Sequence, residues 1–306
     1  MDASFKYLFS PLKIGSITVK NRVFTPAFGT NLTGLHHRNP VEEDPPKDFL
    51  FEKWLDYHEE RAKGGFGLIE TSEFGSHITG CLYNMSVLPD DRYFSVFKEL
   101  ADRVHKYGTK LIPMIHNLGP GARSMWTWRE TWGPSPVRNP FNRELNHEME
   151  PEEIQEIIDS YPEIAAMFQK AGCDGVQLQA AHNFLIGSFL SPATNKRKDR
   201  YGGDLDGRMC LITEIIQGIR KRCGKNFVVG TTLSGDELIP GGYNLDEGKE
   251  IAKRLEAVGI DYIEVRLGGA RLIPNWIGDM SVPLGVAVPL AAAIRQSVEV
   301  PVLTVN

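Results

Sequence analysis

The amino-acid sequence predicts an α/β fold, a (β/α)8 TIM barrel that stops before its eighth β/α unit, over residues 1–306. Short apolar runs rich in β-branched residues alternate with longer helical patterns, and such runs are typical of parallel strands buried on both faces. The repeated order of strand then helix favours a parallel sheet. No GxGxxG motif follows the first strand, which disfavours a doubly wound dinucleotide-binding sheet.

The expected strands are Val23–Ala27, Gly67–Thr71, Lys110–Ile115, Gly175–Leu178, Phe227–Leu233, Asp261–Val265 and Pro301–Val305. The expected helices lie at about 47–63, 91–106, 151–171, 206–223, 245–258 and 285–298. Pro151 opens the third helix, and Asn244 with Glu247 forms a start similar to a capping box in the fifth. Pro162 lies inside the third helix, where we expect a kink or a lost hydrogen bond.

The chain stops at Asn306, at the end of the seventh expected strand. A closed barrel needs an eighth strand, so we expect an open gap at this point. Either the sequence is a fragment or a partner supplies the rest, and we favour a fragment. Residues 1–306 are therefore interpreted as one barrel domain that is incomplete at its C-terminus.

The composition, with 42% hydrophobic and 24% charged residues and a formal charge of −5, offers no basic field for nucleic acid or an anionic membrane. The four cysteines form no CxxC pair, so neither a disulfide framework nor a metal site is expected. No signal peptide and no run of 18 apolar residues is evident. We expect a cytoplasmic protein with a small-molecule substrate and with no nucleic-acid or membrane partner. A homo-oligomer is compatible with the sequence.

Several segments together resemble a known family: residues 9–27, 133–137, 171–208, 233–242 and 300–306. They resemble the Old Yellow Enzyme family of FMN-dependent NADH:flavin oxidoreductases, nearest its 2,4-dienoyl-CoA reductase and trimethylamine dehydrogenase branch. The resemblance runs through the whole chain in the expected order, and the 171–208 block is long and specific. It implies FMN at the top of the barrel, NAD(P)H as electron donor and hydride exchange at the flavin N5. An iron–sulfur cluster and FAD would belong only to a C-terminal extension.

The resemblance assigns the first strand end to cofactor binding. Thr25, Pro26 and Ala27 match the stretch whose backbone lies against the isoalloxazine ring, and small or rigid residues suit a chain pressed against a flat ring. Pro26 could also simply end the strand. Thr71, at the end of the second strand, is counted with the cofactor-binding residues.

Two further cofactor positions depart from the family. Asn117 stands where the family has a glutamine that reads the flavin pyrimidine edge, and it is one methylene shorter. Thr232 stands where the family usually has an arginine beside the flavin N1 and O2, so the charge of the reduced ring is less well compensated. Arg266 and Arg271 lie near the sixth strand end and could substitute, although surface roles explain them equally well.

Gln179 and His182 match the pair that the family places over the flavin to hydrogen-bond a substrate carbonyl, as an oxyanion hole does. Gln179 could also be a satisfied polar residue of the barrel mouth. Phe184 replaces the tyrosine that protonates the substrate in many ene-reductases, and phenylalanine has no proton to give.

Other groups must therefore supply any proton. Glu73, Tyr83 and His116 are candidates that the sequence does not rank. Trp126, in the long loop after the third strand, is assigned with Phe184 to substrate binding, although ordinary packing would also explain it.

The leading interpretation is NAD(P)H-driven reduction of the activated C=C bond of an enone, enoate or enoyl thioester. An alternative from the same branch is oxidative demethylation of an amine, with Phe184 boxing an alkylammonium group through cation–π contact. A third is a flavin-free barrel that binds a small molecule, because several family residues are replaced.

Overall fold

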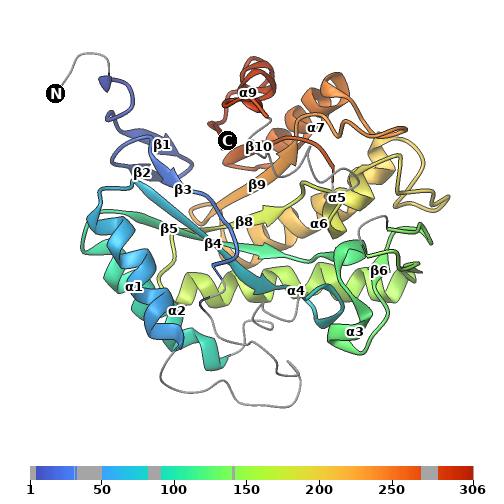
Figure 1. Ribbon diagram of the computed structural model, residues 1–306, viewed down its shortest axis with the longest axis horizontal. Helices are drawn as coiled ribbons and strands as arrows, with labels where there is room; N and C mark the ends of the chain where they lie inside the picture. The colour runs from blue at the N-terminus through green and yellow to red at the C-terminus, as the bar shows by residue number, and fades with distance from the viewer. Residues whose placement is uncertain are drawn as a thin grey trace.

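The computed structural model describes residues 5–30, 32, 50–81, 91–139, 142–269 and 282–305. Its main element is a curved sheet of seven parallel strands, in the order β11-β10-β9-β8-β5-β4-β3 (Figure 1). The strands are β3 (Phe24–Thr25), β4 (Leu68–Gly75), β5 (Lys110–His116), β8 (Gly175–Gln179), β9 (Val228–Ser234), β10 (Tyr262–Arg266) and β11 (Val302–Thr304). All seven expected strands are confirmed, and each pairs with its neighbour in the chain order of the sheet, as a barrel requires.

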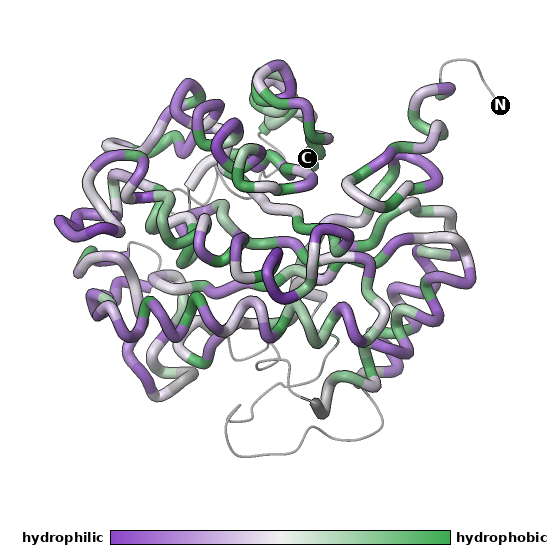
Figure 2. The backbone as a smooth tube through the Cα atoms, turned by 180° about the vertical axis from the view of Figure 1, so that it is seen from behind, coloured by the Kyte–Doolittle hydropathy of each residue, from purple (hydrophilic) through white to green (hydrophobic). Residues whose placement is uncertain are grey.

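Helices cover the outer face of this sheet (Figure 1). They are α1 (Leu50–Lys63), α2 (Asp91–His105), α4 (Pro151–Lys170), α6 (Leu205–Cys223), α7 (Leu245–Val258) and α9 (Val288–Arg295), and they confirm the six expected helices. The capping box of α4 forms between Glu150 and Glu153, and the Asn244 side chain caps α7 at Glu247 N. In Figure 2, hydrophilic and hydrophobic stretches alternate along these helices, as expected for helices with one buried face.

Pro162 remains inside α4, and the structure shows what packs against it. A Cβ placed on Gly218 of α6 would lie 2.8 Å from Pro162 Cγ. The absence of a side chain at Gly218 therefore lets α6 approach the proline ring closely.

Several short elements were not expected from the sequence. They are the hairpin of β1 (Leu12–Ile14) with β2 (Ile17–Val19), the pair β6 (Trp132–Gly133) with β7 (His147–Glu148), the short helices α3 (Ser124–Thr127) and α5 (Leu185–Leu190), and the single turns η2 (Ile78–Gly80) and η3 (Gly119–Gly121). All but the hairpin lie in loops that follow the strands.

Side-chain alternation divides the sheet into two faces. One face packs against the helices in the main core, with Ile69, Val176 and Ile263 as examples. The other face points into the barrel, where the hairpin residues Ile14 and Val19 close the end at which the strands begin. They pack there with Leu68, Ile112, Val228 and Tyr262.

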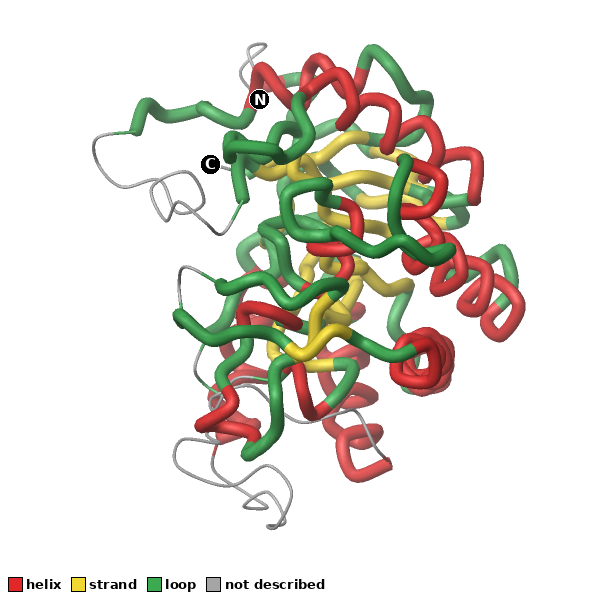
Figure 3. The backbone as a smooth tube through the Cα atoms, turned by 90° about the vertical axis from the view of Figure 1, so that its right-hand side faces the viewer, coloured by secondary structure: helices red, strands yellow, loops and turns green. Residues whose placement is uncertain are grey.

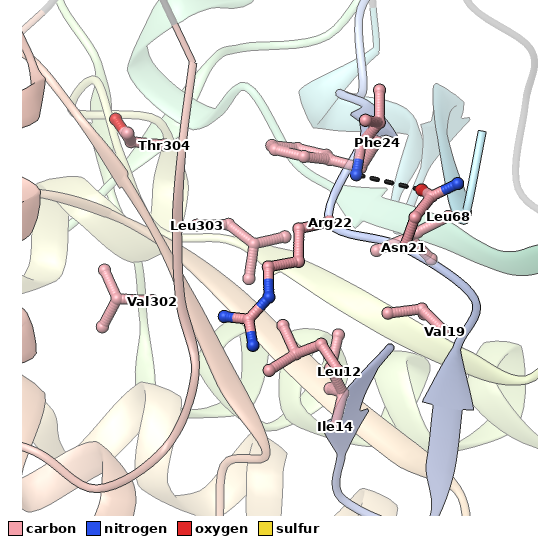
Figure 4. Close-up of a pocket in the computed structure, with 11 residues that line it drawn as sticks. Leu12, Ile14, Val19, Asn21, Arg22, Phe24, Leu68, Val302, Leu303 and Thr304 are labelled. Carbon is pink, nitrogen blue, oxygen red and sulfur yellow. Dashed lines mark hydrogen bonds between the residues drawn. The ribbon is translucent and has the colours of Figure 1, made fainter. Parts of the chain in front are cut away.

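The two edge strands of the sheet are β3 and β11, and no pairing joins them in the part of the chain that the structure describes. Between them lies a groove of about 190 Å³, lined by Leu12, Ile14, Val19, Asn21, Arg22, Val23, Phe24, Leu68, Val302, Leu303 and Thr304 (Figure 4). The groove is mostly apolar and continues the packing of the hairpin against the strand ends.

Across the described ranges, no helix combines the length and apolar character needed to cross a bilayer.

Candidate functional site

The carboxyl ends of the strands and the loops that follow them form one end of the sheet, which we call the mouth (Figure 3). It includes the ends of β4, β5, β8, β9 and β10 with the segments that leave them. Parallel strands place all of these ends on the same side, so residues far apart in the sequence meet there. Most of the sequence-predicted site residues lie in this region.

Thr232 lies inside the barrel, fully buried, and links β9 to the end of β8. Its hydroxyl donates to Gln179 Oε1 and accepts the backbone N–H groups of Ala180 at 3.0 Å and Ala181 at 3.2 Å. The threonine that stands at the position of the expected arginine thus fixes the backbone and side chain where β8 passes into the loop that carries His182. Its role as a cofactor contact stays a prediction.

Gln179 has a defined orientation. Its Oε1 accepts from the Thr232 hydroxyl and from Ala181 N at 3.2 Å, so the oxygen must face these donors. The Nε2 group then points the other way, and the residue is half-buried. Nε2 has no acceptor within the described residues, and Gln179 therefore has a donor left for a ligand.

His182 is buried at the mouth in a left-handed backbone conformation, with φ of 62°. Its backbone N–H donates to Ser234 Oγ at 3.1 Å, and Ser234 Oγ donates to Gly268 O at 2.8 Å. Burial, and then the charge of Arg266, lower the pKa of His182 to about 3, against the effect of a hydrogen bond to the Gly268 backbone. The imidazole is therefore neutral near pH 7.

The neutral state limits what the His182 imidazole can donate. It has one N–H, and the hydrogen bond to the Gly268 backbone uses it, so the other nitrogen offers a lone pair. In this structure Gln179 is the better placed of the two to donate to a substrate oxygen. The donor role of His182 stays a prediction that requires the Gly268 contact to be released.

A buried carboxyl group holds the loop that carries His182. Glu237 accepts from the Ser191 hydroxyl at 2.7 Å, from Tyr243 N at 2.9 Å and from Asn183 Nδ2. Burial raises the pKa of Glu237 to about 7. Asn183 follows His182 in the chain, so this carboxyl fixes both ends of the segment around α5.

Asn117 lies just beyond β5 and is buried in the loop structure. Its Oδ1 accepts from Gly119 N at 2.8 Å, and its Nδ2 donates to Ser76 Oγ at 3.3 Å. A Cβ on Gly80 would lie 1.8 Å from Asn117 Oδ1, so the amide is enclosed by the loop. Both ends of the amide are engaged by the protein, and its predicted contact with the flavin remains untested.

The strand ends assigned to the flavin ring are present as expected. Thr25 is buried, and Pro26 and Ala27 follow it half-buried beyond β3. Thr71 is buried too, but the pleat of β4 turns its side chain to the helix-facing side with Ile69. A contact from Thr71 would therefore come from the backbone, and the assignment of these four residues stays a prediction.

Phe184 is buried at the start of α5, where it packs with Leu118 and Ala122. Its ring centroid lies 6.2 Å from that of His182, in an edge-to-face arrangement. Phe184 is thus beside the predicted substrate position, and its ring offers an apolar wall.

The three tryptophans of the loop after β5 differ in their surroundings. Trp126 belongs to α3, but its side chain lies outside the described residues. Trp128 is 81% exposed, and Trp132 stacks on His77 with centroids 4.8 Å apart. The substrate role of Trp126 therefore remains a prediction.

Of the three candidate proton donors, His116 is the one whose side chain is described. It is buried at the end of β5, where its backbone oxygen accepts from Ser76 N at 2.7 Å. The side chain of Glu73, and all of Tyr83, lie outside the described residues, as does Arg271.

A polar layer lies inside the barrel beneath the mouth. Gln177 Nε2 donates to Glu70 Oε1 at 2.8 Å and to Glu264 Oε2 at 2.7 Å. Tyr262 OH donates to the same oxygen of Glu70 at 2.6 Å. Burial, and then the negative charge of Glu264, raise the pKa of Glu70 well above its ordinary value.

Arg266 connects this layer to the mouth. Its Nη2 lies 2.6 Å from Glu264 Oε1, and its side chain is 18% exposed while that of Glu264 is not exposed at all. The pair is therefore an ion pair with its anion buried and its cation on the side of the mouth.

Sequence reasoning missed Glu70, Gln177 and Glu264 as a group. The signal was a glutamate or a glutamine inside each of three strand runs, GLIET, GVQL and DYIEV. A polar residue in such a run requires a buried partner, because an unpaired buried polar group is costly.

The chemistry of the mouth fits a flavin ring. The Arg266 guanidinium is a donor suited to the acceptor edge of an isoalloxazine, and Pro26 with Ala27 offers a small, rigid surface beside it.

Comparisons with known proteins show the family of this chain. A family model described as the NADH:flavin oxidoreductase / NADH oxidase family matches residues 7–306. An NADH oxidase of Thermoanaerobacter brockii is 35% identical over 99% of this chain and 45% of its own length. An N,N-dimethylglycine/sarcosine dehydrogenase of Chromohalobacter salexigens is 34% identical over 98% of this chain and 43% of its own.

Among solved structures, a complex of 2-naphthoyl-CoA reductase with 2-naphthoyl-CoA superposes with a TM-score of 0.89 and 30% identity. It covers 98% of this chain and 46% of that one. This chain thus spans less than half the length of these three relatives.

Proposed function

This chain belongs to the NADH:flavin oxidoreductase / NADH oxidase family, and from that premise we propose that residues 1–306 are the FMN-binding barrel of an NAD(P)H-driven ene-reductase. FMN is the cofactor of this family, and when bound it supplies hydride taken from the nicotinamide. The proposed substrate is an activated C=C bond conjugated to a carbonyl, as in an enone, enoate or enoyl thioester.

The observation that carries this proposal is the fixed amide of Gln179. Thr232 and Ala181 hold its oxygen, so its Nε2 group is presented without rotation toward a ligand. A donor that is already oriented stabilises the charge that develops on a carbonyl oxygen at no cost of reorganisation. The reaction class follows from that donor, because hydride addition to the β-carbon places negative charge on this oxygen.

The other residues support the same reaction. Phe184 gives an apolar wall for the alkene, and the neutral His182 shapes the mouth beside it. Because Phe184 cannot protonate the product carbon, we propose that water or another group, with His116 as one candidate, delivers that proton.

The test is anaerobic oxidation of NADH or NADPH by the purified, FMN-loaded protein with an enone, an enoate and an enoyl thioester. We expect Gln179→Leu to retain FMN and to lower kcat on the order of 10²–10³-fold, as loss of one oxyanion-type donor does. Thr232→Val, which leaves the amide in place but frees it to rotate, should have a smaller effect. Turnover at the wild-type rate by Gln179→Leu would contradict the assignment.

A second candidate is oxidation of an N-methylated amine. Phe184 favours it, because an oxidation needs no proton donor at that position and an aromatic ring suits an alkylammonium group. Anaerobic mixing with a secondary or tertiary amine would then bleach the flavin absorbance without any nicotinamide, whereas the ene-reductase requires NAD(P)H.

We also propose a cytoplasmic location and a small-molecule partner, with a homo-oligomer left to be measured. All four cysteines are free thiols in the structure, and three of them are buried. Free thiols suit a reducing compartment. The net charge of −5 disfavours nucleic acid as a partner.

A further inference from the structure

We propose that Arg266, held by the buried carboxylate of Glu264, supplies the positive charge that stabilises the reduced flavin at the mouth. The inference rests on the proposed function, because it concerns the FMN of the same site. It makes Arg266 a cofactor-binding residue and Glu264 its positioning residue.

The strand register places Arg266 two residues beyond the level of Thr232, toward the mouth. In the pairing of β10 with β9, Glu264 lies beside Thr232 and Arg266 lies beside Ser234. Residues two apart on a strand point to the same face and are roughly 7 Å apart along it. The Arg266 side chain turns back toward Glu264, so its guanidinium lies between the level of Thr232 and the rim of the mouth.

Glu264 is anchored from below. It is fully buried and accepts from Gln177 Nε2 at 2.7 Å, and the same Nε2 group donates to the neighbouring Glu70. In this ion pair the Glu264 carboxylate lies on the strand side and the Arg266 guanidinium on the mouth side. This arrangement directs the positive end of the pair toward a ligand in the mouth.

The guanidinium retains unused donors. Its Nη2 group forms the ion pair with Glu264, and its Nε group is buried with no acceptor among the residues that the structure describes. A guanidinium carries five N–H groups in a planar fork, which suits an acceptor edge such as N1 and O2 of the isoalloxazine.

The neighbouring residues of the mouth are uncharged. Gln179 and Thr232 are neutral side chains, and burial together with Arg266 keeps His182 neutral. Reduction adds negative charge at N1 and O2 of the flavin, so a cation at this edge binds the reduced ring more tightly than the oxidised ring. Arg266 is the charged residue in this group that meets that requirement.

The experiment measures the affinity of the FMN-loaded protein for sulfite, by loss of flavin absorbance near 450 nm. Sulfite adds to the flavin N5 and leaves negative charge on the N1–O2 edge, so its dissociation constant reports positive charge there. We expect Arg266→Gln to retain FMN and to raise the sulfite dissociation constant about 10–100-fold, the equivalent of one charge-assisted hydrogen bond. Arg266→Lys, which keeps the charge, should change it only a few-fold.

Two further variants complete the design. Glu264→Gln should raise the sulfite constant less than Arg266→Gln, because the cation remains but loses its anchor. Thr232→Arg combined with Arg266→Gln should lower the constant again, since it returns a cation to the adjacent strand. Arg222→Gln is the matched control, because Arg222 pairs with Glu163 on the surface and should leave sulfite binding unchanged.

The outcomes separate the two proposals. Failure of the wild-type protein to bind FMN would overturn the proposed function and this inference together. Tight FMN binding with an unchanged sulfite constant in Arg266→Gln would overturn the inference alone. The inference would also fail if that variant raised KM for an enoate carboxylate but left KM for a neutral enone and the sulfite constant unchanged, since Arg266 would then serve the substrate.

Discussion

The two halves of the barrel interior are built from the same strands but by opposite chemistry. At the closed end, Leu68, Ile112 and Val228 pack against the hairpin in an apolar cluster. Two residues further along β4, Glu70 begins the polar layer with Gln177 and Glu264. The closed end is stabilised by burial of apolar area, whereas the layer under the mouth depends on the hydrogen bonds and the ion pair that join its polar groups.

This contrast separates the residues that stabilise the barrel from those that also serve its chemistry. A substitution at the closed end should change the free energy of unfolding and leave ligand binding alone. A substitution in the polar layer should change both, because Glu264 holds the cation of the mouth.

The largest effect is expected from Gln177→Leu in the polar layer. It keeps the volume but removes the Nε2 donor shared by Glu70 and Glu264, and each acceptor left without it costs about 1–3 kcal/mol. Denaturant unfolding of the variant measures the loss. Gln155→Leu, on the exposed face of α4, is the matched control and should stay within about 0.5 kcal/mol.

At the closed end, Ile112→Ala should lower the free energy of unfolding by about 3 kcal/mol, because it opens a cavity in a fully buried cluster. The sulfite and FMN dissociation constants of the variant should equal those of the wild type. Leu284→Ala, at a residue that is 95% exposed, is the control for loss of the same atoms without a cavity. Weakened FMN binding in Ile112→Ala would show that the two halves are coupled.

The smallest expected effect is a pH dependence of the free energy of unfolding, and it arises from Glu237 in the loops above the mouth. The pKa of Glu237 is raised from its ordinary value near 4.5 to about 7 by burial, so the folded state disfavours its ionised form. Its contribution to stability is complete below about pH 4.5 and is lost as the pH rises through about 7. Between pH 5 and pH 7 the loss is about 2 kcal/mol.

Glu237→Gln tests this sign, since the amide cannot ionise. The difference in unfolding free energy between wild type and variant should move against the wild type as the pH rises from 5 to 7. His182, whose pKa is lowered, acts in the opposite direction in both proteins and cancels in the difference. A difference that is constant with pH would contradict the assignment.

Much of the fold could be predicted from local patterns. The strands of the sheet follow short apolar runs and the long helices follow amphipathic patterns, and helix starts such as Pro151 carry their own capping residues. The hairpin of β1 and β2 was not predicted, although the sequence carries its signal: Gly15 and Ser16 separate two short apolar runs. In the structure Gly15 forms the turn with a φ of 53°. The short elements after β5 carry too few residues for any periodicity to emerge.

At the site, the sequence alone identifies the residues that lie at the strand ends. The family resemblance singled out Gln179 and His182 among them. The lack of a proton donor at Phe184 is equally a matter of sequence. The direction in which an amide points is not, because the Gln179 orientation depends on Thr232, which is 53 residues away in the chain.

The assembly of the polar layer depends on the tertiary structure. Gln177 is 107 residues from Glu70 and 87 residues from Glu264, yet one amide group contacts both. Strand periodicity specifies the face on which each side chain lies, but not which strand is adjacent or at what height. Those depend on the register of the curved sheet of parallel strands, and that register placed the Arg266 guanidinium at the mouth, where the sequence alone left it equally suited to the surface.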